Sequence, residues 1–444
     1  MHATLNTAQL FRTEADMALD EARKRKADKL KDLGQPIKLP SKPIAMQVAG
    51  DAVWTAESGH VLRKSSLETG ATLQLFKGHD GPVSALAFAD GYVITGSWDK
   101  TIRVWDTSTK TLLSTTVAHR DFIKTLIVIP SQRVLASGSS DKSIRFWDLS
   151  DPNWARSPLK ALGACSAHTR PVVCLAVDEN SFTCTRLFSA DSAGFIKVWL
   201  IERQYGVHAK CRAVLETELG GHRTGINEMR HGGGLLWTAS TDATARLTAY
   251  PVPRNPLEPI PELQHDMAVK CILPLPATKI SQPYVLTGSG DSIRLYDIST
   301  LHEPEVIAEF DAHAHDVTAL AYWLRENKLW IVSASLDGTI RKWNFTEIVN
   351  QRRQPKAKQR LPTPPAPVVV PSIALTAEEE AELEDLMDSE DSDSDGSRED
   401  SPEPGYGSHQ PSPPPASSAG GSSAHGSSES LPKPESLPKP ADVA

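Results

Sequence analysis

The sequence predicts an all-β protein made of repeated units, and one stretch shows the unit most clearly. Residues 78–106 begin with Gly-His and end with Trp-Asp. Between these ends, Val83–Phe88, Tyr92–Thr95 and Thr101–Trp105 alternate in polarity and are rich in β-branched and aromatic residues, which is typical of strands. The pairs Asp90-Gly91 and Asp99-Lys100 stand where tight turns are needed.

The unit recurs along the chain. Histidines stand at similar points of six units, with spacings of 40, 49, 54, 43 and 48 residues; they are His79, His119, His168, His222, His265 and His313. Such spacings match repeats of ~40–45 residues with loop insertions. An earlier unit, residues 43–77, contains three or four strands without the histidine. The repeat resembles the WD40 repeat, which implies that residues 43–350 form a seven-bladed β-propeller of four-stranded blades.

The resemblance also implies a structural relay in each blade, in which Asp, His, Ser or Thr, and Trp side chains are joined by hydrogen bonds. A buried carboxylate and imidazole are stable when each satisfies the other, and the indole N–H supplies the last donor. The complete sets are His79, Thr95, Asp99 and Trp105 in blade two, His119, Ser137, Asp141 and Trp147 in blade three, and His313, Ser333, Asp337 and Trp343 in blade seven.

The other blades depart from this pattern. Blade four has Ala193 at the aspartate position. Blade five has Thr248 at the tryptophan position, and blade one has Ser65 there. Blade six keeps Asp291, but its turn is one residue shorter and Tyr296 replaces the tryptophan. We expect these changes to alter the relays and not the fold.

Residues 1–42 are predicted to form a helical arm and a linker. Residues 14–33 contain good helix formers and no Gly or Pro, and Gly34 follows them. Their charged faces favour a helix packed on the propeller, and a short coiled coil or partner helix is the alternative. Two segments are candidates for the strand that closes the ring, Ile37–Leu39 and Phe345–Val349.

Residues 351–444 are predicted to form a disordered tail. They hold 16 of the 33 prolines, with runs of Ser and Gly, so they cannot bury enough apolar surface to offset chain entropy. Residues 378–400 hold 13 acidic residues against one Arg. Four serines resemble kinase targets, because an acid or a proline follows at the expected distance: Ser392, Ser397, Ser401 and Ser412.

The composition narrows the class of function. Residues 35–350 carry 32 basic and 32 acidic side chains, and this neutral body argues against direct nucleic-acid binding. The five cysteines show no CxxC spacing, which favours a reducing, intracellular compartment, either cytoplasm or nucleus. No apolar run is long enough to insert into a membrane. No metal, cofactor or catalytic motif stands out, and His231-Gly232-Gly233-Gly234 lacks the nucleophile elbow that a lipase-type site requires.

The candidate binding site is the propeller's top face. WD40 geometry implies that this face carries the turn before the third strand of each blade and the loop after each Gly-His. Its candidate partner-binding residues are Trp98, Arg120, Phe122, Arg170 and Arg223. An aromatic group beside three arginines suits an acidic or phosphorylated peptide. The alternative is scattered surface charge that is balanced by Asp80, Asp121 and Asp316.

The resemblance therefore implies a non-catalytic scaffold that binds peptide segments of other proteins. One alternative is a substrate receptor of a cullin-type ubiquitin ligase, but Ser108 and Ser150 stand where such receptors often carry Arg. Another is a component of a nuclear RNA–protein assembly, which the basic clusters at residues 23–26 and 352–360 favour.

Overall fold

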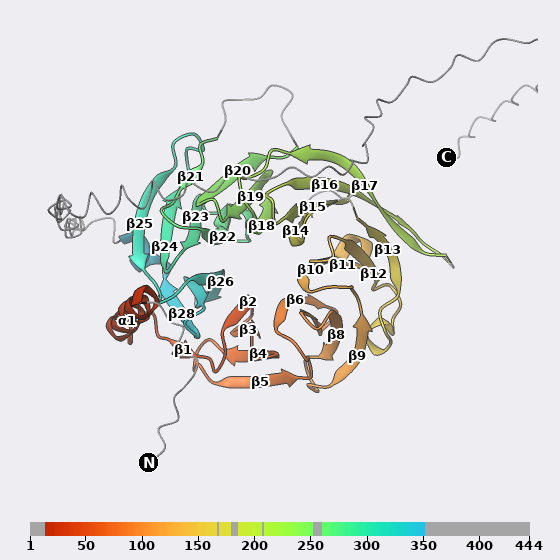
Figure 1. The fold of residues 1–444 in the computed structure, drawn as a ribbon, viewed down its shortest axis with the longest axis horizontal. Helices are drawn as coiled ribbons and strands as arrows, with labels where there is room; N and C mark the ends of the chain where they lie inside the picture. Colours follow the sequence, from red (N-terminus) through yellow and green to blue (C-terminus); the bar gives the residue numbers. More distant parts are fainter. Residues whose placement is uncertain (1–13, 167, 179–184, 207, 252–259, 351–444) are drawn as a thin grey trace, which may run out of the picture. The chain divides into compact units, whose positions relative to one another are not determined.

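The computed structural model describes residues 14–350, except residues 167, 179–184, 207 and 252–259. In this part of the chain, seven four-stranded antiparallel sheets surround a central channel as the blades of a β-propeller (Figure 1). This confirms the all-β, seven-bladed prediction. One helix, α1 (Glu14–Lys29), precedes the blades, and a short one, α2 (Phe345–Asn350), follows them.

Each blade runs from an innermost strand at the channel to an outer strand. Blade one contains β2 (Pro43–Ala49), β3 (Ala52–Glu57), β4 (Val61–Ser66) and β5 (Thr72–Lys77). Blade two contains β6 (Val83–Ala89), β7 (Tyr92–Ser97), β8 (Thr101–Asp106) and β9 (Leu112–Val117). Blade three contains β10 (Ile123–Ile129), β11 (Val134–Ser139), β12 (Ile144–Asp148) and β13 (Ala161–Cys165). Blade four contains β14 (Val172–Asp178), β15 (Thr185–Asp191), β16 (Ile196–Gln204) and β17 (Lys210–Leu219).

The remaining blades follow the same order. Blade five contains β18 (Ile226–Gly232), β19 (Leu235–Ser240), β20 (Thr244–Ala249) and β21 (Leu263–Gln264). Blade six contains β22 (Val269–Pro274), β23 (Tyr284–Ser289), β24 (Ser292–Asp297) and β25 (Glu305–Asp311). Blade seven contains β26 (Val317–Arg325), β27 (Lys328–Ser335), β28 (Thr339–Asn344) and β1 (Ile37–Lys38). Short 3₁₀ turns cover Pro130–Gln132 (η2), Trp154–Arg156 (η3) and Leu275–Ala277 (η4).

The N-terminal segment closes the ring. Strand β1 pairs antiparallel with β28, with Ile37 opposite Ile340 and Lys38 opposite Thr339. Of the two candidates, the segment beginning at Ile37 is therefore the closing strand, and Phe345–Asn350 is a helix. Because residues from both ends of the propeller share one sheet, blade seven fastens the ring.

Apolar side chains fill the spaces between neighbouring blades. Seven buried clusters lie in the described part of the chain, and each combines residues of two adjacent blades. The cluster between blades one and two, for example, contains Trp54 and Phe76 from the first and Val93 and Trp105 from the second. Burial of these apolar side chains between blades makes the largest favourable contribution to the stability of the ring.

A β-bulge recurs near the start of every innermost strand, a feature that the spacing of residues does not predict. The bulged residue is the second of its strand in all seven blades: Ile44, Ser84, Lys124, Val173, Asn227, Lys270 and Thr318. In three blades, its side chain donates to the first carbonyl of the next innermost strand. The donors are Ser84 to Ile123 (2.5 Å), Asn227 to Val269 (2.7 Å) and Thr318 to Pro43 (3.1 Å). We call these three contacts the inter-blade hydrogen bonds.

Helix α1 lies beside blades six and seven (Figure 1). The Lys26 ammonium group lies 2.6 Å from Asp291 Oδ2 and 2.8 Å from Asp311 Oδ1. Leu30, just after the helix, is buried, and the Arg341 side chain donates to its carbonyl and to that of Leu33 at 2.5 Å each. The predicted helix therefore exists and packs on the propeller, although it ends at Lys29.

Candidate functional site

The three relays predicted to be complete have connected hydrogen bonds in the structure. In blade two, His79 Nδ1 lies 2.7 Å from Asp99 Oδ2 and Nε2 lies 2.8 Å from Thr95 Oγ1, which accepts a 2.9 Å bond from the indole of Trp105. In blade three, the distances from His119 to Asp141, from His119 to Ser137 and from the Trp147 indole to Ser137 are 2.9, 2.7 and 2.9 Å. In blade seven, the distances from His313 to Asp337, from His313 to Ser333 and from the Trp343 indole to Ser333 are 3.1, 2.8 and 2.9 Å.

The electrostatics of these groups fit a structural role. Burial opposes ionisation of Asp141, but hydrogen bonds from Ser143, the Arg120 main chain and His119 outweigh it and lower the pKa to about 2. Burial also lowers the pKa of His119, against the attraction of Asp141. A carboxylate whose pKa is low thus faces a buried imidazole whose two nitrogens are both engaged, and this network holds the turn between the second and third strands.

Blade four has a complete relay with a different carboxylate. His168 Nδ1 lies 3.2 Å from Asp191 Oδ2, and Nε2 lies 2.6 Å from Ser189 Oγ. The expectation that Ala193 leaves this blade without a carboxylate is therefore wrong. Asp191 is the last residue of β15 and reaches the imidazole from two residues earlier in the chain.

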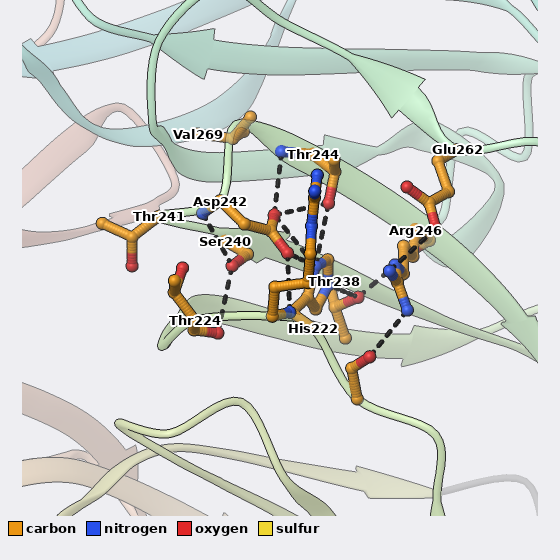
Figure 2. A network of polar contacts seen from close by, with 12 residues as sticks. His222, Thr224, Thr238, Ser240, Thr241, Asp242, Thr244, Arg246, Glu262 and Val269 are labelled. Carbon is orange, nitrogen blue, oxygen red and sulfur yellow. Dashed lines mark hydrogen bonds and ion pairs between the residues drawn. The ribbon is translucent and has the colours of Figure 1, made fainter.

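Blade five keeps the relay without an indole (Figure 2). The His222 imidazole lies 3.2 Å from Asp242 Oδ2, 2.9 Å from Thr244 Oγ1 and 2.7 Å from Thr238 Oγ1. Thr248 stands opposite Leu236, in the register position that Trp105 occupies opposite Val93 in blade two. The Thr244 hydroxyl also bonds Asp242 at 2.5 Å, as Thr101 bonds Asp99 in blade two.

Blade six has no carboxylate on its histidine. His265 Nε2 lies 3.3 Å from Thr287 Oγ1 and 3.1 Å from the Tyr296 hydroxyl, while Nδ1 has no hydrogen-bond partner among the described residues. Because the turn is shorter, the Asp291 side chain lies at α1 instead, where it pairs with Lys26. Burial lowers the pKa of His265 to about 4, helped by the charge of Arg294 and opposed by that of Asp266.

Blade one replaces the histidine relay with a buried ion pair that sequence reasoning missed. Arg63 Nε lies 2.6 Å from Glu57 Oε1, and Thr55 donates to the same oxygen at 3.1 Å. Ser41 donates to the other carboxylate oxygen. Glu57 follows Thr55 by two residues, as Asp191 follows Ser189 in blade four, and that shared spacing is the signal that would have revealed it.

The relay turns and the loops before the innermost strands lie at the same end of the ring. This end is the predicted top face, and we call it the relay face from here on. At this face, the rings of Trp98 and Phe122 stack with centroids 5.2 Å apart. The Lys124 ammonium group lies 4.9 Å from the Trp98 centroid and 5.8 Å from that of Phe122. The Trp98 indole N–H has no hydrogen-bond partner in the described residues. Neighbouring blades two and three thus build an aromatic platform beside a cation.

The three predicted arginines follow one another around this face. Arg120, Arg170 and Arg223 belong to blades three, four and five, and each is exposed. None of their side chains takes part in an ion pair within the described residues. The structure thus brings them to one arc of the face, beside the aromatic platform at blade three.

The acids that were expected to balance these arginines have other partners. Asp80 lies 3.8 Å from Arg103, Asp121 accepts a 2.8 Å bond from the Phe122 main chain, and Asp316 lies 3.6 Å from His315. The arc of blades three to five therefore carries three arginines without an ion-pair partner among the described residues, and such groups attract acidic ligands.

The relay face opens onto the central channel, a cavity of about 920 Å³. Its lining includes Trp98, Lys124 and Lys270 near the relay face. Deeper in the channel, Arg230 bonds Glu228 at 2.8 Å and donates to the Leu320 carbonyl of blade seven at 3.0 Å. Cations thus outnumber carboxylates along this passage.

Several predictions concern residues that the structure does not describe. The tail of residues 351–444, including the candidate phosphorylation sites Ser392, Ser397, Ser401 and Ser412, lies outside the described residues. Within residues 14–350, apart from the gaps given above, no helix is long and apolar enough to cross a membrane. The same residues contain no group of three or more His, Cys, Asp or Glu side chains that could hold a metal ion.

Comparison with known families agrees with this geometry. The family model described as "WD domain, G-beta repeat" matches residues 70–106, 110–148 and 304–344, which include three of the blades with complete relays. The chain belongs to the WD40-repeat β-propeller superfamily. Blades four, five, six and one of this WD40 propeller carry the altered relays described above, and the family model does not match most of their length.

Three relatives show which proteins the WD40 propeller is similar to. An uncharacterized WD repeat-containing protein of Schizosaccharomyces pombe is 26% identical over 403 residues, covering 86% of this chain and 99% of that protein. A ribosome biogenesis protein WDR12 homolog of Anopheles gambiae is 25% identical, covering 63% of this chain and 64% of that protein. The ribosome biogenesis protein YTM1 of Ajellomyces capsulatus is 36% identical over 130 residues, which are 29% of this chain and 25% of that protein.

Proposed function

We propose that this WD40 propeller is a non-catalytic scaffold that binds acidic segments of partner proteins on its relay face. The observation that supports the proposal is the set of unpaired arginines Arg120, Arg170 and Arg223 beside the stacked rings of Trp98 and Phe122. Guanidinium groups form paired hydrogen bonds with carboxylates and phosphates, and aromatic rings supply contact area at a low cost in entropy.

The proposal includes the division of the chain into an arm (residues 1–42), a propeller (43–350) and an acidic tail (351–444). The propeller is the binding platform, because its buried relays and clusters fix the turns that carry the binding residues. A rigid platform binds with less loss of conformational entropy than a flexible loop would.

A binding titration tests the proposal. A fluorescent peptide of alternating Glu and Ser is titrated in unphosphorylated and fully phosphorylated forms at low salt. Reversing the charge of Arg120, Arg170 and Arg223 to Glu should weaken binding about tenfold or more, because each reversal replaces attraction with repulsion. A control reverses Arg156, Lys160 and Arg212, which are also exposed but lie elsewhere on the propeller. Equal weakening by both sets would contradict the proposed site.

We further propose that the scaffold works in a nuclear RNA–protein assembly, through protein contacts. Two relatives named as ribosome biogenesis proteins support this, as do the basic clusters at residues 23–26 and 352–360. The ligase-receptor alternative is less well supported, because Ser108 and Ser150 instead bond the preceding aspartates, Asp106 and Asp148, at 2.6 Å each. Purification of the tagged chain should recover ribosome-assembly proteins; recovery of cullin subunits alone would favour the alternative.

A further inference from the structure

Two grooves at the end of the ring opposite the relay face are covered by aromatic side chains of the chain itself. Between blades two and three, Trp154 of η3 lies edge-on to Tyr92, with centroids 5.5 Å apart, and its indole donates to Asp90 at 3.2 Å. Leu113 of β9 packs against the same buried cluster. The segment after β12 thus fills this groove.

The groove between blades six and seven is covered in the same way. Phe345 of α2 lies at a steep angle to Tyr284, with centroids again 5.5 Å apart. Ile307 of β25 belongs to the same cluster and is 8% exposed. In both grooves, a short helical turn after the third strand of one blade places an aromatic ring on a tyrosine of the preceding blade.

The equivalent groove between blades one and two is open. Strand register makes Ala52 the equivalent of Tyr92, because each begins the second strand of its blade. Leu73 is the equivalent of Leu113 and Ile307, yet it is 48% exposed. Only a tight turn follows β8, in which Ser108 and Thr109 donate main-chain bonds to Asp106.

This open groove is a cavity of about 670 Å³ with aromatic walls. Trp54, Leu73, Phe88 and Tyr92 line it, together with Lys64. The Lys64 ammonium group lies 5.1 Å from the Trp54 centroid and has no ion-pair partner among the described residues.

The two acids at the groove are already engaged. Asp51 accepts a 3.0 Å bond from the indole of Trp323, and Asp90 pairs with Arg133 at 2.8 Å. Among the three charged residues that line the groove, Lys64 is therefore the one without a bonded partner in the described residues, and its ammonium group is available to an acidic group on whatever occupies the groove.

We propose that this groove docks a helical segment of a partner protein that inserts one aromatic side chain and places a carboxylate near Lys64. The chain's own α2 supplies the aromatic part of this chemistry, since its first residue, Phe345, covers the groove between blades six and seven. Ala52 stands where the covered grooves have a tyrosine, so the open groove has space for an inserted ring. The site is separate from the relay face, so it gives the scaffold a second attachment point.

Methyl NMR with two small probes tests the chemistry of the groove. N-acetyl-tryptophan keeps a carboxylate, and N-acetyl-tryptophanamide does not. We expect saturable shifts of the Leu73 methyl groups, with the carboxylate probe binding about threefold more tightly, and no such preference in Lys64→Ala. Leu112 is 42% exposed outside the groove and serves as the control. Absence of saturation at Leu73, equal shifts at Leu112, or a preference that Lys64→Ala retains would overturn the proposal.

Photocrosslinking in cells tests the partner. The full chain carries p-benzoylphenylalanine in place of Leu73, with the same replacement of Leu112 as the control. We expect a crosslinked helical peptide that contains an aromatic residue, and loss of at least nine-tenths of the crosslink when that residue is changed to Ala. A crosslink no stronger than at Leu112, or one that survives the change to Ala, would contradict the proposal. The arginine reversals on the relay face should leave it unchanged, so the two proposals fail separately.

Discussion

The histidine of blade six should make the stability of the propeller depend on pH. His265 is buried beside Thr287 and Tyr296, with no carboxylate on its ring. Its pKa falls from the ordinary 6.5 to about 4, mainly through burial. The unfolded chain therefore binds a proton near pH 6.5, whereas the folded chain resists it until about pH 4. Stability is fully present at pH 7 and is lost as the pH falls between these values.

The size of this loss follows from the two pKa values. Each tenfold difference in proton affinity is worth 1.36 kcal/mol, so the full effect is about 3 kcal/mol, of which about 2 kcal/mol has appeared by pH 4.5. His265→Gln removes the titrating ring and keeps an oxygen that can accept from Thr287 and Tyr296. We expect the variant to be about 1 kcal/mol less stable than the wild type at pH 7 and more stable at pH 4.5.

Urea unfolding at pH 7.0, 5.5 and 4.5 measures the effect. The free-energy difference between wild type and His265→Gln should change by about 2 kcal/mol over this range. Effects of other groups, such as the relay aspartates, occur in both proteins and cancel. The control is His222→Gln, whose effect should change less, because Asp242 faces that ring and supports its charged form. If the free energies of unfolding of wild type and His265→Gln change with pH by the same amount, the reasoning is refuted.

Three other predictions concern stability at pH 7. Asp141→Asn should lower the free energy of unfolding by about 2 kcal/mol, because a partly buried, hydrogen-bonded carboxylate is lost, whereas the exposed change Glu303→Gln should have little effect in thermal unfolding. Lys26→Ala should cost about 1 kcal/mol more than Lys24→Ala at low salt, and the difference should shrink in 1 M salt if the contacts to Asp291 and Asp311 are ionic. Ser84→Ala removes an inter-blade hydrogen bond and should cost about 1 kcal/mol by urea unfolding; no change would show that this bond adds nothing.

The sequence predicted the fold well because the repeat itself carries the information. Alternating strands, turn residues and recurring histidines depend on local spacing, so seven blades could be counted without coordinates. The relays of blades two, three and seven could be assigned because the aspartate precedes the tryptophan by six residues in each. That same rule placed Ala193 in blade four and overlooked Asp191, since a carboxylate at another position can reach the same imidazole.

Contacts between distant segments could not be predicted from spacing. Lys26 and Asp311 are 285 residues apart, and no local pattern links them. The open groove between blades one and two appears only when strand register aligns Leu73 with Leu113 and Ile307. The unpaired state of Arg120 likewise depends on where each nearby acid finds its partner.

The altered relay of blade six and the N-terminal segment are best understood together. Because its turn is shorter, blade six holds Asp291 away from His265. Without another partner, this carboxylate would be unpaired close to blade seven, where the ring closes. Lys26 neutralises that carboxylate, and Arg341 of blade seven binds the carbonyls of Leu30 and Leu33. The chain then continues into β1, which completes blade seven. The N-terminal segment that closes the ring therefore also neutralises Asp291, the carboxylate that blade six does not use in its own relay. The departure of blade six from the repeat and the closure of the ring thus depend on the same few residues.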